Sequence, residues 1–529
     1  MPHTMPPTPT QTPPAGLYPF WFWNDDLDAD EIRRQIYEMH AKGVKGFFIH
    51  PRQGLQQPYM SSSFLGLVRV AIETARRLGM VVHLYDEYPY PSGVAGGEVI
   101  LGRPAFQATH LQQRIFDVKG GRIRLELTRG YTLQCIAFPI TDDGVVEWLD
   151  PQDLRADVGM VLRAESFMKG GLTVYNRKRY FASEPTPTLD TQLPPGQWRI
   201  FLSTQTLVEG HKYWYNFVDV LNPEAIREFL RLTHERYFRC FGEDFGGLVQ
   251  SIFVDETAPQ WSALIPAEFA KECGYDLSER LCALQDESHP QHLRTTADLQ
   301  RVRHRMFCES FDGQIRDWCH AHGLKYSGEK TQQRFSQFDY MDIPGCEPGH
   351  TKAGNPDLDY LRAGLRQNAR AATSAAYFHG KEGALCECFH SLGWSGTLQD
   401  ARLIAEGLLL MGIRYLVPHG FFYSTHGLKK HDAPPTFFHQ MPYWPLFGHM
   451  TARLDRITIP FEGTWIDAKI LLLDPSAALP TEDQSAVYER LLWNLAGAHL
   501  DFHIGDLDVL SSAQMEGSLL RVRDLEIST

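Results

Sequence analysis

The chain has 529 residues, more than the roughly 250 to 300 at which a single hydrophobic core stops growing, so we expect a large domain with additions. Apolar residues make up 43% of the sequence, and no run approaches the about 20 consecutive apolar residues that a membrane span needs. Acidic residues outnumber Lys and Arg by 64 to 51, and the net charge of -13 disfavours binding to nucleic acid backbones.

Residues 1–16 are rich in Pro and Thr and lack the basic start and apolar centre of a secretory signal. We therefore expect a disordered N-terminus and a cytoplasmic protein. The nine cysteines show no repeated spacing, and Cys386 and Cys388 suit alternate faces of a strand better than a metal clip. This pattern favours neither a disulfide scaffold nor a structural metal held by sulfur.

Residues 17–104 repeat a short apolar strand followed by an amphipathic helix, which is typical of βα units around a parallel sheet. Asp28 and Ser61 are candidate N-caps of two helices, and Gly43 and Gly79 are expected to end them. The expected strands are 18–24, 44–50 and 80–87.

The pattern changes over residues 105–208, where short alternating segments are separated by Gly, Asp and Pro, and we expect an inserted β domain there. A helix that starts at Pro223 then resumes the barrel, which is expected to continue over 209–455. From 464 to 529, a strand, a helix and a strand predict a C-terminal α/β (flavodoxin-like) unit that is short for a complete doubly wound domain. The later barrel strands are expected at 248–255, 324–330, 338–345, 384–390 and 413–420.

Eight strands with helices between them favour an α/β fold of the (β/α)8 TIM barrel type over a doubly wound sheet. In such a barrel the active site lies at the carboxyl ends of the strands, so polar residues that finish apolar strands are informative. The candidates are Asn24, His50, Arg52, Asp86, Glu87, Asp255, Glu256, Glu329, Glu387, His390 and His419.

A single acid at a strand end often caps the next helix. Acids at four strand ends are harder to explain in this way, because buried like charges cost stability unless they have a function. Cleavage of a glycosidic bond requires one carboxylic acid to protonate the leaving oxygen and a second carboxylate as base or nucleophile. Glu256 and Glu387 both lie in apolar strands, whereas Glu329 has Lys330 beside it, which strengthens a purely structural explanation of Glu329.

Burial and the neighbouring Asp255 are expected to keep Glu256 protonated, as a general acid requires. Glu387 has to stay ionised to act as a base, and we expect hydrogen-bond donors from His390, Trp394 and the His419 region.

Aromatic side chains accompany these acids, and their rings can pack against the CH faces of a sugar. Most aromatic residues belong to a core, but those just past strand ends suit a substrate better. The aromatic candidates for substrate binding are Trp23, Tyr88, Trp394 and Tyr423. The polar candidates for substrate binding are Asn24, His50, Arg52, Asp86, Glu87, Asp255, His390 and His419.

Five segments together resemble glycoside hydrolase family 106 over residues 17–450: PFWFWND, YDEYPYPSGVAGG, VDVLNPEAIREFLRLTHERY, FGGLVQSIFVDET and CECFHSLGWSGTLQDARLIAEGLLLMGIRYLVPHGFFYS. That family is known for α-L-rhamnosidases with a split barrel, an inverting mechanism, a glutamate acid, a glutamate base and a calcium ion near the sugar hydroxyls. The resemblance implies Glu256 as the acid and Glu387 as its partner, with Glu329 the next choice. It also implies Ca²⁺ as a cofactor, without identifying its ligands, and a glycoside or oligosaccharide as substrate.

Three other functions compete with this interpretation. Acids on strands four and seven also occur in retaining exo-glycosidases of the β-galactosidase type. A non-catalytic carbohydrate-binding protein could share the same fold. A metal-dependent amidohydrolase needs histidines at metal-ligand spacing on an early strand, and the first strand, WFWN, contains none.

Overall fold

The structure is a computed structural model that describes residues 12–169, 178–349, 361–517 and 519–528. Most of the expected disordered N-terminus, residues 1–11, lies outside the described residues. The chain forms two compact units, each described by itself below. Unit 1 comprises Met1–Arg103, Pro223–Ala258 and Cys308–Thr529, and unit 2 comprises Pro104–Asn222 and Pro259–Phe307.

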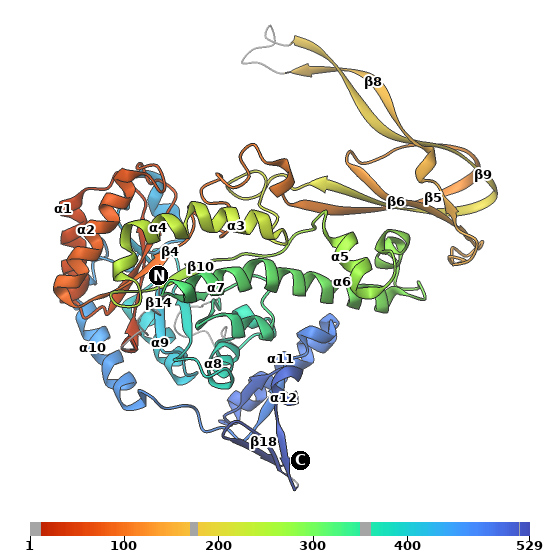
Figure 1. The fold of residues 1–529 in the computed structure, drawn as a ribbon. Helices are drawn as coiled ribbons and strands as arrows, with labels where there is room; N and C mark the ends of the chain where they lie inside the picture. Colours follow the sequence, from red (N-terminus) through yellow and green to blue (C-terminus); the bar gives the residue numbers. More distant parts are fainter. Residues whose placement is uncertain (1–11, 170–177, 350–360, 518, 529) are drawn as a thin grey trace, which may run out of the picture. The chain divides into compact units, whose positions relative to one another are not determined.

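Unit 1 contains a closed parallel barrel of eight strands, which confirms the predicted fold class (Figure 1). Each strand pairs with the next one along the chain, and β14 pairs with both β13 and β2 to close the barrel. A short strand β1 (Gly16–Leu17) is added to β14 outside this ring. The barrel strands are β2 (Phe20–Trp23), β3 (Gly46–Pro51), β4 (Val81–Tyr85), β10 (Val249–Val254), β11 (Lys325–Gly328), β12 (Ile343–Cys346), β13 (Leu385–Cys388) and β14 (Tyr415–Phe422).

Large side chains fill the interior of the barrel. Because successive residues of a strand point to opposite faces, every second residue faces inward. On β2 these are Phe20 and Phe22, which join Phe48, Tyr85 and other residues in one buried cluster. The interior is therefore a packed core, and polar groups can gather only where it ends, at the mouth.

Helices of unit 1 surround this barrel (Figure 1). The predicted N-caps are confirmed: Asp28 accepts from the N–H groups of the first helical turn, and Ser61 accepts from Phe64 N at 3.2 Å. Gly79 takes a left-handed φ of 65° where its helix ends. The helices are α1 (Ala29–Ala41), α2 (Ser62–Leu78), α3 (Pro223–Leu232), α4 (His234–Phe241), α7 (Gln314–Ala321), α8 (Ala369–Phe378), α9 (Leu398–Leu410) and α10 (Phe447–Thr458).

The sixth barrel strand starts later than the sequence suggests. Residues Phe335–Tyr340 form a 3₁₀ turn instead of the start of a strand, and β12 begins only at Ile343. Phe335 and Phe338 are both buried, a spacing of three that matches one face of a 3₁₀ turn. The prediction of a strand over 338–345 was therefore wrong in its first half.

The C-terminal residues of unit 1 contain the expected strand, helix and strand: β15 (Leu471–Leu473), α11 (Glu482–Gly497) and β16 (His503–Gly505). The two strands are parallel, with Leu471 paired with His503. A short helix α12 (Leu507–Ser511) and a three-stranded antiparallel sheet follow, made of β17 (Gln514–Glu516), β18 (Leu519–Val522) and β19 (Leu525–Ser528).

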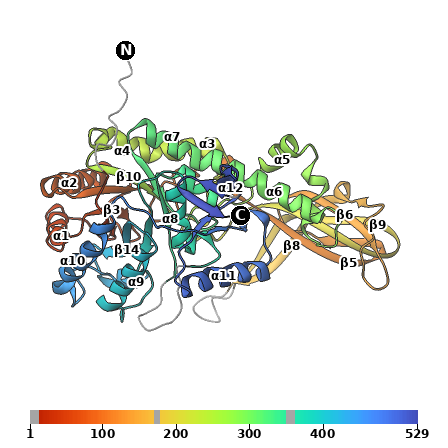
Figure 2. The same cartoon turned by 90° about the horizontal axis from the view of Figure 1, so that it is seen from below.

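Unit 2 is built on a five-stranded antiparallel sheet with long strands (Figure 2). Its strands are β5 (Thr109–Glu126), β6 (Tyr131–Ile140), β7 (Gln152–Asp153), β8 (Val158–Lys169) and β9 (Lys178–Leu207). The unit also includes α5 (Ile265–Cys273) and α6 (His292–Phe307). Residues 259–307 are thus grouped with the inserted strands, in place of the single block 209–455 that the sequence suggested.

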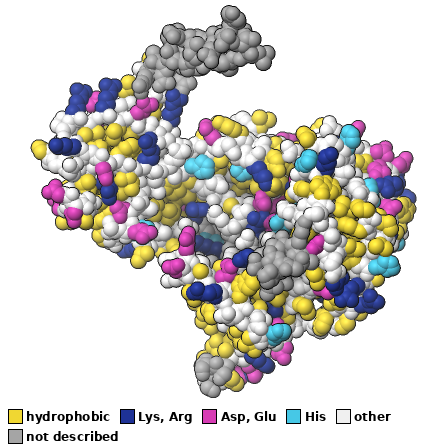
Figure 3. Space-filling model, turned by 180° about the vertical axis from the view of Figure 1, so that it is seen from behind, with side chains coloured by type: hydrophobic (Ala, Val, Ile, Leu, Met, Phe, Trp, Pro, Cys, Tyr) yellow, Lys and Arg dark blue, Asp and Glu magenta, His cyan; other side chains and the backbone are white. Residues whose placement is uncertain are grey.

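Acidic and basic side chains are interspersed on the face of the molecule shown in Figure 3. None of the helices in the described part of the chain combines the length and apolar character needed to span a membrane.

Candidate active site

Four consecutive barrel strands each bring an acidic residue to the mouth of the barrel. Asp255 and Glu329 follow β10 and β11, Glu347 follows β12, and Glu387 lies within β13. Asp255 comes two residues after Phe253, and Glu387 two residues after Leu385, both members of the barrel core. By this alternation the two acids point inward as well.

Three of these carboxyl groups lie very close together. Oxygen atoms of Asp255, Glu329 and Glu387 all lie within 4.8 Å of one another, and all three residues are buried. Burial raises the pKa of Asp255 well above its usual range, and the nearby Glu387 and Glu329 raise it further. Burial likewise raises the pKa of Glu387, again with a contribution from Glu329. Glu329 and Glu387, both expected at the barrel mouth, thus lie side by side.

Arg366 brings a positive charge to the acids at the barrel mouth. Its Nε atom lies 2.6 Å from Glu329 Oε2, and its Nη2 atom lies 2.9 Å from Glu256 Oε1. The same Nη2 atom also contacts Glu347. Burial opposes the charge, but Glu329 and Glu256 together hold the pKa of Arg366 above its ordinary value. We name Glu256, Glu329, Glu347 and Arg366 the Arg366 cluster.

Glu256 occupies the outer part of the site. Alternation along β10 would point the Glu256 side chain away from the barrel interior, toward which Asp255 points. The backbone of Glu256 adopts a left-handed φ of 50°, which is uncommon for a residue other than Gly, and its carboxylate accepts a hydrogen bond from Arg366. Its side chain is 25% exposed. The fully desolvated environment that the sequence suggested for Glu256 is therefore not present, because Asp255 and not Glu256 faces the core.

Glu387 also differs from expectation in its partners. Among the described residues, its Oε2 atom accepts no hydrogen bond. The expected donor His390 instead lies 3.1 Å from the carbonyl oxygen of Pro348 and 3.6 Å from Glu347. Arg366 and Arg52 are the positive groups that lower the pKa of Glu387, against the larger effect of burial.

A second group of polar residues consists of His50 on β3, Arg52 directly after that strand, and His419 on β14. Arg52 donates to both carboxylate oxygens of Asp432, at 2.7 and 2.9 Å, and its guanidinium lies between the rings of Phe22 and Tyr90. Another of its nitrogens lies 3.3 Å from His50 Nε2. Arg52 is thus held in one orientation by ring contacts and by a bidentate ion pair.

The surroundings of the two histidines of this group disfavour their charged form. Burial lowers the pKa of His50 and His419 well below the usual range, and the positive charge of Arg52 lowers it further. Tyr85 joins the histidines to the acids, since its ring stacks on His50 at 3.6 Å and its hydroxyl donates to Asp255. The acids and the histidines therefore form one continuous polar surface in the mouth of the barrel.

Asp86 and Glu87 do not join this surface. Glu87 accepts hydrogen bonds from five backbone N–H groups of the following loop, those of Tyr88, Gly93, Val94, Ala95 and Gly96. Burial raises the pKa of Glu87 to about 7, against the effect of these donors. Asp86 accepts from Ser92 Oγ at 2.6 Å. Both acids hold the loop after β4, and a contact of either acid with substrate stays a prediction.

The aromatic candidates are also divided. Trp23 is fully buried against Trp21 and Phe64, because in β2 it is Phe22 that faces inward. Tyr423 accepts from Asp28 N at the start of α1. These two residues therefore support the barrel wall, which corrects their assignment to substrate binding.

The remaining candidates lie in loops. Asn24 is buried and exchanges two hydrogen bonds with the backbone of Ser424, so it fixes a loop. Tyr88 stacks on Tyr59 and is half-buried. Trp394 is 42% exposed. Of the four aromatic candidates, Tyr88 and Trp394 are therefore the two that are not buried.

Sequence reasoning missed Glu347 and Arg366. A sixth strand placed to end at Cys346 would have marked Glu347 as a polar residue at a strand end. Arg366 lies in a 3₁₀ turn, Leu365–Gln367, far from any strand end in sequence, and no motif marks it.

The buried acids can hold a cation that prefers oxygen ligands. Asp255, Glu329 and Glu387 supply three carboxylates within reach of one ion, and Glu329 Oε1 and Glu387 Oε2 accept no hydrogen bond from the described residues. Calcium and magnesium take such ligands, whereas zinc favours nitrogen and sulfur. The donor set therefore fits the calcium that the family resemblance implies.

Comparisons with known proteins were made for the sequence and for the fold. No protein-family model matches the chain. A protein of Formosa agariphila with the name "Putative beta-glucuronidase" is 22% identical over 447 residues, which cover 77% of this chain and 36% of that protein. The structure of a rhamnosidase from Novosphingobium sp. PP1Y superposes with a TM-score of 0.64 at 15% identity and covers 97% of this chain and 65% of that chain.

A GH5_18 structure from Streptomyces cattleya in complex with GlcNAc has a TM-score of 0.40 at 8% identity, with 94% of this chain and 95% of that chain covered. The chain spans 36% of the Formosa agariphila relative and 65% of the rhamnosidase chain. At these levels of identity, the likeness to the rhamnosidase establishes the α/β barrel fold.

Proposed function

We propose that this protein is a glycoside hydrolase that removes a terminal sugar. The observation that carries the proposal is the group of carboxyl groups at the mouth of a closed barrel, because cleavage of a glycosidic bond requires two of them with different protonation. The rhamnosidase fold and the name of the Formosa agariphila relative both support glycoside chemistry.

In this proposal Glu256 is the general acid and Glu387 is the base. Glu256 lies at the rim and is partly exposed, so it can reach a leaving group that points out of the barrel and can regain its proton from solvent after each turnover. Glu387 lies deeper, where a water molecule beside its carboxylate would attack the opposite side of the sugar. Glu329 holds Arg366 and is a ligand for a cation, and does not itself transfer a proton.

Calcium fits this site as a resident ion. Asp255, Glu329 and Glu387 would hold it, and its positive charge would keep the three carboxylates ionised in spite of their burial. A carboxylate has two oxygens, so Glu387 can contribute one to the ion and keep the other for water. Tyr85, which donates to Asp255, fixes one of these ligands.

We propose an α-L-rhamnoside as substrate and inversion as the stereochemical outcome, which follow from the family resemblance and the rhamnosidase fold. The name of the Formosa agariphila relative favours a β-D-glucuronide as the second candidate. A retaining mechanism with Glu387 as nucleophile is the alternative for either sugar, since retaining pairs lie about 5 to 5.5 Å apart and inverting pairs about 6.5 to 9.5 Å.

The test is a screen of 4-nitrophenyl glycosides that includes the α-L-rhamnoside, the β-D-glucuronide and the β-D-galactoside. The wild-type protein should release nitrophenol from one of them, and Glu387→Gln should lose this activity by more than about a hundredfold. Binding of a sugar without hydrolysis by the wild-type protein would instead favour a non-catalytic carbohydrate-binding protein.

A further inference from the structure

Arg366 is carried by a short turn between β12 and α8. Leu361 and Asn368 form an antiparallel bridge across the base of this turn, residues 361–368. The Asn368 side chain donates to the carbonyl oxygen of Arg362 at 2.7 Å and also caps the first turn of α8. The end of the turn nearer α8 is thereby fixed.

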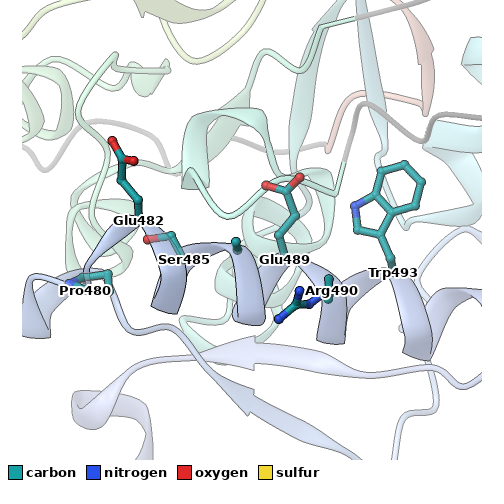
Figure 4. Close-up of a pocket in the computed structure, with 7 residues that line it drawn as sticks. Pro480, Glu482, Ser485, Glu489, Arg490 and Trp493 are labelled. Atoms are coloured by element: carbon teal, nitrogen blue, oxygen red, sulfur yellow. The ribbon is translucent and has the colours of Figure 1, made fainter.

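The opposite flank of the turn is held by one residue of α11. Glu489 accepts from Arg362 Nη1 at 2.8 Å with one oxygen and from the backbone N–H of Ala363 at 3.2 Å with the other. The Arg362 guanidinium lies 5.8 Å from the ring centre of Trp493. Figure 4 shows Glu489 and Trp493 on the same side of α11, where they line a pocket of about 630 Å³.

These contacts lie three and four residues before Arg366. The backbone of Arg366 accepts from Glu347 N at 2.7 Å, and its side chain reaches Glu256, Glu329 and Glu347. An arginine side chain loses considerable rotamer freedom when it is held in one place, so its backbone has to be fixed for the side chain to stay on its targets. Glu489 supplies a side-chain contact and a backbone contact at the same point.

We propose that Glu489 is a positioning residue of the active site: it fixes the turn 361–368 and thereby holds Arg366 on Glu256 and Glu329. The C-terminal α/β unit, to which α11 belongs, thus takes part in organising the site at the barrel mouth. This inference rests on the proposed glycosidase function and adds to it a role for a residue outside the barrel.

The experiment compares Glu489→Gln with the wild-type protein on two aryl glycosides of the same sugar, one with a good and one with a poor leaving group. Glutamine keeps the length of the side chain but loses its charge. Because Arg366 holds the proposed acid Glu256 in place, loosening Arg366 should impair protonation of the leaving group. The value of kcat should therefore fall roughly threefold to tenfold on the poor leaving group and less on the good one, with KM nearly unchanged. Arg362→Met, which breaks the same contact from the turn, should give the same pattern.

The matched control is Glu482→Gln, an exposed residue on the same side of α11 (Figure 4), which should behave as wild type. A double-mutant cycle with Arg366→Met, which removes the positive charge, separates positioning from a general structural effect. If Glu489 acts through Arg366, Glu489→Gln should change kcat by less than about twofold in the Arg366→Met background. Equal losses in both backgrounds, or no loss in the wild-type background, would overturn the inference.

Hydrogen exchange of residues 361–368 distinguishes a failure of this inference from a failure of the proposed function. Glu489→Gln should speed exchange in the turn, whichever substrate the protein cleaves. Unchanged exchange would overturn the inference even in an active enzyme. A wild-type protein that cleaves no glycoside, but shows faster exchange in the variant, would overturn the proposed function and leave the anchoring of the turn supported.

Discussion

The Nε atom of Arg366 lies 2.6 Å from Oε2 of Glu329, and the same guanidinium also contacts Glu256 and Glu347. One positive charge thus forms ion pairs with three carboxylates at the barrel mouth. Removing one partner from a buried group of charges destabilises the folded protein, because the remaining charges are no longer neutralised.

Replacement of Arg366 by Met should therefore destabilise the protein by about 3 kcal/mol at pH 8. The loss should shrink at pH 5, because burial raises the pKa of Glu387 and Arg366 lowers it, so that a protonated Glu387 no longer needs this positive charge. Thermal unfolding of Arg366→Met across this pH range measures the effect, with Arg366→Lys, which keeps the charge, as control. A pH-independent loss would mean that packing and not charge is what Arg366 contributes.

Calcium should bind to the cluster of Asp255, Glu329 and Glu387, with an affinity that rises from pH 5 to pH 8. The sign follows from the raised pKa of Asp255 and Glu387, which burial causes: protons occupy these sites at low pH and have to leave before the cation binds. Isothermal titration calorimetry should show binding by the wild-type protein and by Glu224→Gln, an exposed acid on α3. The site is refuted if Glu329→Gln binds calcium as tightly as these two.

Glu87→Gln should destabilise the protein by about 3 kcal/mol, because the amide has one accepting oxygen where the carboxylate has two. Either the N–H groups of Gly93, Val94 and Ala95 or those of Tyr88 and Gly96 then lose their acceptor. Glu98→Gln is the matched control, since Glu98 is partly exposed and pairs with Arg236 near the surface. Thermal unfolding compares the two. Similar midpoints for both variants would show that Glu87 is not the anchor of its loop.

Much of the fold could be predicted because hydrophobic periodicity reports directly on burial. Residues close together in sequence determine the strands VKGFFIH and ALCECFH and the N-caps Asp28 and Ser61. These predictions are confirmed. The 3₁₀ turn before β12 was missed because Phe338 and Tyr340, at the start of the expected strand 338–345, look like strand residues when the tertiary contacts are unknown.

The site could be predicted only in part. Glu329 and Glu387 are identifiable because they finish apolar strands, whereas Arg366 lies in a turn whose position depends on α8 and α11. The role of Glu87 depends on N–H groups that converge only in the folded loop. Trp23 illustrates the importance of register: a shift of one residue decides between the interior and the wall of a barrel.

Inversion predicts the anomer that appears first. Hydrolysis of an α-L-rhamnoside should give β-L-rhamnose initially, which proton NMR detects before the sugar equilibrates in water. Initial formation of the α-anomer would assign a retaining mechanism, with Glu387 as nucleophile and not as base.

The most direct test of the central claim is the leaving-group dependence of kcat/KM in Glu256→Gln and Glu387→Gln. A good leaving group needs little protonation, so Glu256→Gln should lose about a thousandfold on a poor leaving group but less than about tenfold on a dinitrophenyl glycoside. Glu387→Gln should lose activity on both, because the attack of water is impaired whatever group departs. Equal losses of Glu256→Gln across leaving groups, or an active Glu387→Gln, would contradict the assignment of acid and base.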